Sequence, residues 1–132
     1  MTEATNENGL KYATKILQDE WQPTLIYWLG FRPFDMAELA QLIPELSEDQ
    51  LASKIHDLQN LRVVGPVKNS EQRYSLTDDG EQLRHLMIST SVWGVQQQDD
   101  NADRQSMQIV EPKMDASIKD LVKYTDTVKK YL

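Results

Sequence analysis

The stretch that most constrains the fold is residues 47–61, SEDQLASKIHDLQNL. Ser47 can accept a hydrogen bond at the start of a helix, and Gln50, three residues later, can reach back to complete a capping box. Three apolar residues then recur at helical spacing and form one stripe: Leu51, Ile55 and Leu58. The opposite face is small and polar. The sequence therefore predicts a helix with its back in a core and a polar face turned outward.

A shorter helix is expected immediately before this one. Asp35 can cap it, Glu38 stands at the capping-box position, and Pro44 ends it. Only the short turn over residues 44–46 then separates it from Ser47. Two helices joined by so short a turn form a helix-turn-helix unit.

A hairpin is expected after the second helix of this unit. Residues 62–67 are rich in valine and residues 73–76 alternate polar with apolar, so both predict strands, joined by a polar turn over 68–72. Gly65 and Pro66 are expected to interrupt or bulge the first strand. A helix-turn-helix followed by a hairpin predicts a winged helix-turn-helix, whose second helix enters the major groove of DNA.

Two helices are expected ahead of the helix-turn-helix unit. Residues 10–17 carry one apolar stripe, whereas residues 24–29 are apolar on nearly all sides and predict a helix at the centre of the core. Gly30 can take the left-handed conformation that stops the second helix. Residues 1–9 offer nothing to bury and are expected to be flexible.

The region after the hairpin predicts a further helix, a linker and a last helix. Thr77 can cap the first of these helices and Gly94 can end it. Residues 95–113 are polar and without period, which is typical of a linker, and helical period returns over 114–132. The predicted class is mostly α (α+β), with residues 10–94 as a winged helix-turn-helix, a two-stranded wing and an additional C-terminal helix.

Composition excludes several kinds of site. The 132 residues suit one domain with a real core, and the absence of cysteine excludes disulfides and thiolate metal sites. His56 and His85 have no metal-ligand spacing, and no nucleophile motif or phosphate-binding glycine loop is present. We therefore expect no catalytic residue, no cofactor and no metal, and hence no enzyme.

Charge and hydropathy bear on location and partners. The net charge of −7 argues against non-specific nucleic-acid binding by the bulk surface, although it allows a local basic patch. The N-terminal sequence is polar and acidic, and no apolar run approaches the roughly 20 residues needed to span a bilayer. A cytoplasmic protein without membrane contact is the expectation.

Residues 12–94 resemble the HxlR-type winged helix-turn-helix regulators. The stretches that carry the resemblance are DEWQPTLIYWL, RPFDMAELAQLIPELSEDQLASKIHDLQNL, RYSLTDDGEQL and VWG, in this order and spacing. The resemblance implies a small bacterial transcription regulator that binds operator DNA as a homodimer. It also implies that the first helix and the segments after Gly94 form the dimer contact. Because cysteine is absent, the thiol-based sensing of some family members is not expected here.

The expected winged helix-turn-helix and the family resemblance together indicate the candidate site residues. The candidate contacts to double-stranded DNA are Ser47, Gln50, Ser53, Lys54, His56, Lys68 and Arg73. The candidate dimer contacts are Leu10, Leu17, Trp93, Ile118, Leu121, Val122 and Val128. Gln50 can read adenine only if it points into the groove rather than back at its own helix end. Arg32 is a further candidate for the DNA backbone.

Two alternatives stay open at this stage. The predicted recognition helix and its flanks carry four acids, Glu45, Glu48, Asp49 and Asp57, against Lys54 and Arg62. This balance favours a degenerate winged-helix module that binds a protein partner as the second interpretation. The larger aromatic residues can pack in the core, which is preferred, or line a small-molecule pocket at the dimer contact: Trp21, Tyr27, Trp28, Phe31, Phe34 and Trp93.

Overall fold

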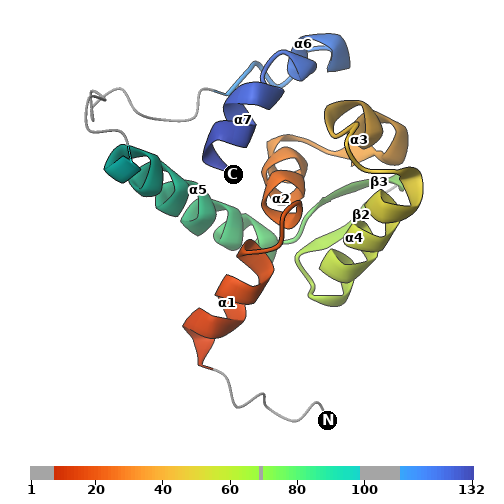
Figure 1. The fold of residues 1–132 in the computed structure, drawn as a ribbon. Coiled ribbons are helices and arrows are strands. Elements are labelled where there is room, and N and C mark those ends of the chain that lie inside the picture. The colour runs from red at the N-terminus through yellow and green to blue at the C-terminus, as the bar shows by residue number, and fades with distance from the viewer. Residues whose placement is uncertain (1–7, 69, 99–110) are drawn as a thin grey trace, which may run out of the picture.

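The computed structural model describes residues 8–68, 70–98 and 111–132 (Figure 1). The elements in chain order are α1 (Gly9–Leu17), α2 (Gln22–Phe31), β1 (Phe34–Asp35), α3 (Met36–Leu42), α4 (Glu48–Asn60), β2 (Val64–Val67), β3 (Ser70–Leu76), α5 (Asp78–Gln98), α6 (Ile118–Val122) and α7 (Thr125–Tyr131). This is the mostly helical winged helix-turn-helix that the sequence predicts. The predicted flexible N-terminus, apart from its last two residues, and most of the predicted linker lie outside the described residues.

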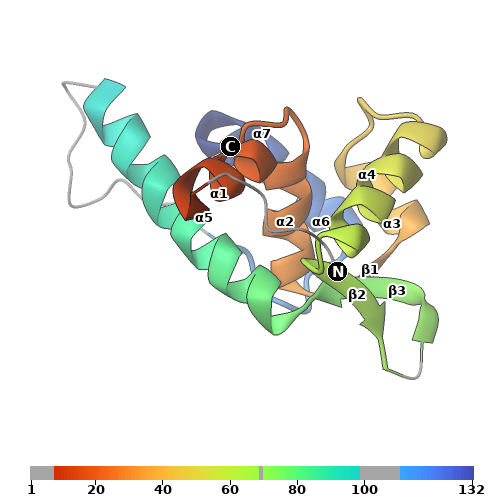
Figure 2. The same ribbon diagram turned by 90° about the horizontal axis from the view of Figure 1, so that it is seen from below.

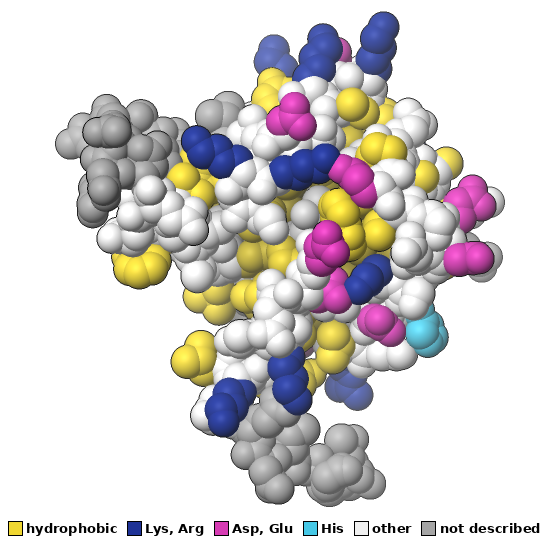
Figure 3. All heavy atoms as spheres, viewed as in Figure 1, with side chains coloured by type: hydrophobic (Ala, Val, Ile, Leu, Met, Phe, Trp, Pro, Cys, Tyr) yellow, Lys and Arg dark blue, Asp and Glu magenta, His cyan; other side chains and the backbone are white. Residues whose placement is uncertain are grey.

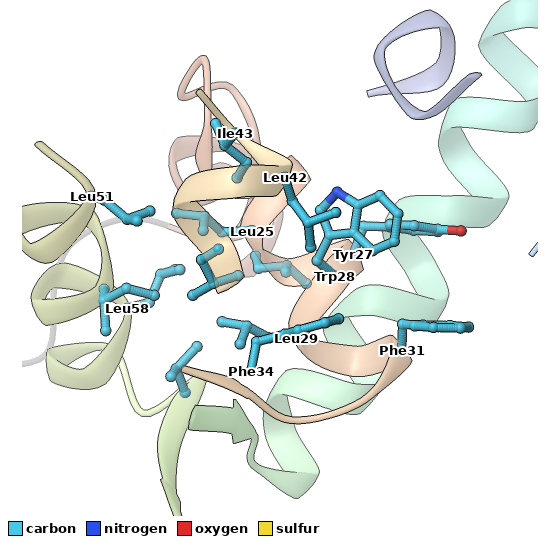
Figure 4. Close-up of a cluster of buried hydrophobic side chains, with 14 of the residues drawn as sticks. Leu25, Tyr27, Trp28, Leu29, Phe31, Phe34, Leu42, Ile43, Leu51 and Leu58 are labelled. Atoms are coloured by element: carbon cyan, nitrogen blue, oxygen red, sulfur yellow. The ribbon is translucent and has the colours of Figure 1, made fainter. Parts of the chain in front are cut away.

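Helix α2 forms the centre of the core. Its residues 22–29 are all buried, as expected for a helix that is apolar on nearly every side. The Trp28 ring makes edge-on contacts with the rings of Tyr27, Phe31 and Phe34, at centroid distances of 5.2, 6.2 and 6.4 Å (Figure 4). Five of the six larger aromatic residues therefore pack in or against the core, and Trp93 alone among them stays exposed.

Gly30 does not end α2 as expected. The helix continues to Phe31, and Gly30 lies inside it without a positive φ. A Cβ atom at Gly30 would lie 2.1 Å from Cδ of Arg84. This glycine is therefore needed for the close approach of the Arg84 side chain from α5 to α2, and the left-handed stop was the wrong explanation.

Both predicted capping boxes are present. The Glu38 amide donates to the Asp35 carboxylate at 2.8 Å, and the Asp35 amide donates to the Glu38 side chain at 3.0 Å. The Gln50 amide donates to Ser47 Oγ at 3.1 Å, and the Ser47 amide donates to Gln50 Oε1 at 2.9 Å. Local spacing alone therefore sets the starts of α3 and α4.

Helix α4 ends in a Schellman motif, with an arginine where glycine is usual. Arg62 has φ 63°, the left-handed conformation. Its amide donates to the Gln59 carbonyl at 3.0 Å, and the Val63 amide donates to the Leu58 carbonyl at 3.0 Å. Thr77 Oγ1 then donates to the Arg62 carbonyl at 2.6 Å and caps α5 by accepting from Gly80, so the two helix ends are joined.

The sheet has three strands rather than the two of the predicted wing. The order is β1-β3-β2, with both pairs antiparallel. Strand β1 was missed because it is only two residues long and pairs with residues about forty positions away. The expected irregularity is present as a register shift between Pro66 and Val67, and Pro66 lies on an edge strand, where its missing N–H is tolerated.

The C-terminal part differs most from expectation. Helix α5 runs through Gly94 to Gln98, and the single helix expected over 114–132 is two short helices, α6 and α7. Helix α6 packs on α3 and α7 packs on α5 (Figure 1). Leu121 and Val128 are 0% and 1% exposed in the chain's own core. The segment therefore folds back on its own domain, because its apolar residues complete the core over α2.

Three sets of polar interactions hold the C-terminal segment, residues 111–132, on the rest of the domain. Arg32 Nη1 donates to the carbonyls of Met114 and Ala116 at 2.7 and 2.6 Å. Arg84 pairs with Glu111 at 2.6 Å, and Lys129 pairs with Glu45. Arg32 thus has a structural role in the described chain, and its Nη1 is already engaged there, while a contact with the DNA backbone stays a prediction.

Candidate nucleic-acid interface

The outward face of α4 is open. Its polar residues are exposed, among them Asp49, Ser53, His56 and Asn60, together with the small Ala52. The inner stripe of Leu51, Ile55 and Leu58 is buried, as predicted. No described segment covers the outward face, so it is free to meet a partner. Figure 2 shows the β2–β3 hairpin projecting beside α4, in the position of a wing.

The side chains at the start of α4 are already engaged. Gln50 uses its amide oxygen to accept from the Ser47 amide, and Ser47 uses its hydroxyl oxygen to accept from the Gln50 amide. In this conformation the amide oxygen of Gln50 points back at its own helix end. The paired donor and acceptor contact by which an amide side chain reads adenine requires Gln50 to leave the capping box.

Lys54 is held by an ion pair. Its Nζ lies 2.5 Å from Oδ1 of Asp19, a residue of the turn between α1 and α2. The other Asp19 oxygen accepts from the amides of Trp21 and Gln22 at 2.9 and 3.0 Å, which caps the start of α2. Partial burial would raise the pKa of Asp19, but these hydrogen bonds outweigh it and hold the pKa below its ordinary value.

The hairpin contributes two exposed cations, Lys68 and Arg73. Lys68 lies just beyond β2, beside the turn, whereas Arg73 lies on the central strand β3, opposite Asp35 of β1. Residues directly opposite on neighbouring antiparallel strands are close enough for their charges to interact. Arg73 therefore has an acidic residue directly opposite it on the neighbouring strand, which Lys68 beside the turn does not share.

Charges of both signs are mixed on the face of the molecule seen in Figure 3. Acidic and basic side chains lie near one another there, and no continuous positive stripe is visible on that face. Lys54, one of the predicted DNA contacts, is paired with Asp19. Electrostatic attraction to phosphates is accordingly weak at this face.

The predicted dimer contacts divide into three groups. Leu10, Trp93 and Val122 are 79%, 64% and 40% exposed and are available to a partner. Leu17 and Ile118 are partly buried against the chain's own core. Leu121 and Val128 are buried within the chain, so they are not available at the surface for a contact with a partner subunit. Tyr12 and Leu86, which were not predicted, are also exposed apolar residues, on α1 and α5.

Sequence reasoning missed Asp19 and Arg84. Asp19 lies just ahead of a predicted helix start, so its capping role could have been predicted. Its ion pair could not, because the partner Lys54 is 35 residues away in the sequence. Arg84 Nε donates to the Tyr27 carbonyl at 2.9 Å, and its guanidinium lies 4.7 Å from the centre of the Tyr27 ring. Burial, with a smaller contribution from Glu111, raises the pKa of Tyr27 to about 12. The tyrosine therefore stays neutral and structural.

Two findings concern other kinds of site. Over residues 8–68, 70–98 and 111–132, no three histidine, aspartate or glutamate side chains come close enough together to hold a metal ion. None of the helices in the described chain has the length and apolar character that crossing a bilayer requires.

Helices α3 and α4 form a helix-turn-helix packed on the core, the β2–β3 hairpin lies beside it as a wing, and the outward face of α4 is exposed. This arrangement is that of the winged-helix class of DNA-binding proteins. The chain matches the family described as HxlR-like helix-turn-helix over residues 16–102, and it belongs to this family. The family indicates a DNA-binding transcription regulator. Comparisons with curated proteins and with solved structures gave no match.

Proposed function

We propose that the protein regulates transcription as a homodimer that places α4 of each subunit in the major groove of operator DNA. The observation that carries this proposal is the uncovered outward face of α4, which is small and polar and braced from behind by α3 and the core. Small side chains such as those of Ala52 and Ser53 allow the helix axis to approach the base edges closely. The wing would follow the flanking backbone with Lys68 and, to a lesser extent, Arg73.

The dimer would form through α1 and α5. Both helices expose large apolar side chains, Leu10 and Tyr12 on α1 and Leu86 and Trp93 on α5. Figure 1 shows both helices extending outward from the core. A two-fold dimer should present its two α4 helices about one turn of DNA apart, roughly 34 Å, and so should favour a nearly palindromic operator.

The charges predict modest affinity. Few lysine and arginine residues are free to replace counterions on the phosphates, so the dependence of affinity on salt should be shallow. Specificity would then come from hydrogen bonds and apolar contacts made by Ser53, His56 and the neighbouring residues of α4.

The test is selection of random DNA fragments on the full chain at low salt, followed by sequencing. Enrichment of a nearly palindromic motif is expected. The matched variants are Ser53→Glu, which adds charge and bulk to the centre of the outward face, and Lys119→Glu, which adds charge on exposed α6. Ser53→Glu should abolish enrichment and Lys119→Glu should preserve it. Absence of any motif with the unsubstituted chain would reject the proposal.

The second candidate is a winged-helix module that binds a protein through the same face. It is favoured by Glu48 and Asp49 in the first turn of α4 and by the neutralised Lys54, which together leave that end of the helix acidic. Such a surface suits a basic partner. The selection experiment separates the two candidates, because a protein-binding module enriches no DNA motif.

A further inference from the structure

A hollow of about 410 Å³ lies between α1 and the C-terminal half of α4. This volume is within the range, roughly 300–1,000 Å³, of sites that hold small molecules. Part of its wall is apolar and comes from both sides, from Tyr12 and Ile16 of α1 and from Leu61 at the end of α4. It therefore offers a small ligand an apolar surface between the helix expected in the dimer contact and the recognition helix.

Gln22 is a polar residue in the lining of the hollow and is only 7% exposed. Its side-chain amide makes no hydrogen bond within the described part of the chain, and the fully buried polar atoms that lack a partner there are those of Tyr27 and Trp28 rather than Gln22. The Gln22 amide therefore keeps contact with the open hollow and is available to a ligand in it.

The charges of the unpaired groups indicate the chemistry of the ligand. Lys15 and Asp19 also line the hollow, but each already has a partner. Asp57 and Asn60, both on α4, line the open side of the hollow; they are exposed, and their side chains have no partner in the described part of the chain. Gln22, Asp57 and Asn60 are thus residues of the lining without a partner in that part of the chain, and together they carry one negative charge and no positive charge. A protonated amine can donate charge-assisted hydrogen bonds to such a set.

We propose that this hollow binds a small protonated amine with an apolar body. The ammonium group donates to the Asp57 carboxylate and to the carbonyl oxygens of the Gln22 and Asn60 amides. The apolar body lies against Ile16 and Leu61. An anionic ligand is disfavoured, because Asp57 would repel it and no unpaired cation in the hollow would offset that repulsion.

The site also has a consequence for DNA binding, and this part rests on the proposed function. Asp19 lines the hollow and at the same time holds Lys54 on its other side. The positive charge of an ammonium group held by Asp57 lies on the hollow side of Asp19 and weakens the attraction of the Asp19 carboxylate for Lys54 without bonding to it. Release of Lys54 gives α4 a free cation, so the amine should tighten binding to operator DNA.

Calorimetric titration of the full chain without DNA tests the site itself. The probes are 2-phenylethylamine, neutral 2-phenylethanol and anionic 3-phenylpropionate, which share an apolar ring and differ in their polar group. Saturable binding of the amine alone is expected. Asp57→Asn should weaken it about tenfold, because a charge-assisted hydrogen bond is lost. Asp49→Asn removes the same charge from α4 outside the hollow and should leave binding unchanged.

Equal binding of the amine and the alcohol, no saturable binding of the amine, or unchanged affinity in Asp57→Asn would each overturn the proposed site. Asp57 is exposed, so its replacement by asparagine does not threaten the fold. A second variant, Gln22→Leu, places an apolar side chain where the amide lies. It should also lose amine binding, with thermal unfolding as the check that the chain remains folded.

A DNA-binding titration with and without the amine then tests the regulatory consequence. The amine should tighten operator binding severalfold, and Asp57→Asn should remove this effect. Amine binding without any change in operator affinity would overturn the effector role. Amine binding by a chain that binds no DNA would reject the proposed function and leave the site in place, whereas operator binding without amine binding would do the reverse.

Discussion

The ammonium group of Lys54 lies 2.5 Å from the carboxylate of Asp19, so the one lysine of the recognition helix is tied to the turn between α1 and α2. Both side chains are about one quarter exposed. The pair is therefore partly screened by solvent, and its strength is that of a modest surface interaction. The Lys54–Asp19 pair matters mainly for DNA binding, because it offsets a positive charge on the face proposed to meet DNA.

Asp19→Asn should strengthen DNA binding. Loss of the carboxylate frees Lys54, while the asparagine side-chain oxygen can still accept from the amides that start α2. We expect affinity to rise severalfold and the slope of log affinity against log salt to steepen by about one, because one further phosphate is neutralised. Binding of the selected operator at several salt concentrations measures both. Glu20→Gln removes the same charge one residue away and should change neither the affinity nor its slope by as much; equal changes would show that Lys54 is not the cause.

Leu121→Ala should destabilise the whole domain, although it lies in the C-terminal segment. Leu121 is fully buried against the core, so its truncation leaves a cavity and should lower the free energy of unfolding by about 3 kcal/mol. Val122→Ala, at the next position, is the control, since Val122 is 40% exposed and should lose well under 1 kcal/mol. Urea unfolding of both variants makes the comparison. Similar small losses would contradict the folding of this segment onto its own domain.

Arg62→Gly should stabilise the protein. Arg62 holds φ 63° at the end of α4, a conformation that costs an L side chain free energy and costs glycine almost none. The expected gain in the free energy of unfolding is about 1 kcal/mol, reduced somewhat by the greater freedom of glycine in the unfolded chain. Arg62→Ala removes the same side chain without relieving the backbone, so it should give no gain. A gain in both variants would point to charge rather than to φ.

The features that sequence could predict are those set by residues close together in the chain. The capping boxes of α3 and α4 join residues three apart, and the apolar stripe of α4 repeats within one helix, so both were predicted and found. The missed features join distant residues. Asp19 meets Lys54 across 35 positions, and Arg32 meets Met114 across 82. No periodicity or spacing rule relates positions so far apart.

The glycines show a second limit. The same residue type can end a helix, allow close packing or simply be tolerated, and the sequence does not distinguish these roles. Gly30 and Gly94 were both expected to end helices, yet both lie within them. The difference between them comes from what surrounds each position, since a Cβ at Gly30 would strike Arg84 and one at Gly94 would meet nothing within 4 Å.

Two glycines of α5 should therefore respond oppositely to replacement by alanine. A Cβ at Gly80 would lie 2.2 Å from the Val63 carbonyl oxygen, so Gly80→Ala must displace backbone and should cost about 3 kcal/mol of unfolding free energy. Gly94→Ala adds a methyl group in open space within a helix and should gain up to about 1 kcal/mol. Thermal or urea unfolding distinguishes them. A loss in Gly94→Ala would show that this position needs glycine for a contact with another chain.

Trp93→Glu should convert the proposed dimer to monomer. Trp93 is 64% exposed on α5, and a large aromatic residue left exposed on a helix that extends from the core is typical of the anchor of an interface. Burying a carboxylate at that position without a partner is unfavourable, so the dimer dissociation constant should rise by at least about 30-fold. Gln97→Glu adds the same charge one turn further along α5 and serves as the control. Sedimentation equilibrium of the three proteins measures the constant. An unchanged mass distribution for Trp93→Glu would place the dimer contact elsewhere, and the spacing of the two α4 helices would then have to be set by another surface, such as that of α1.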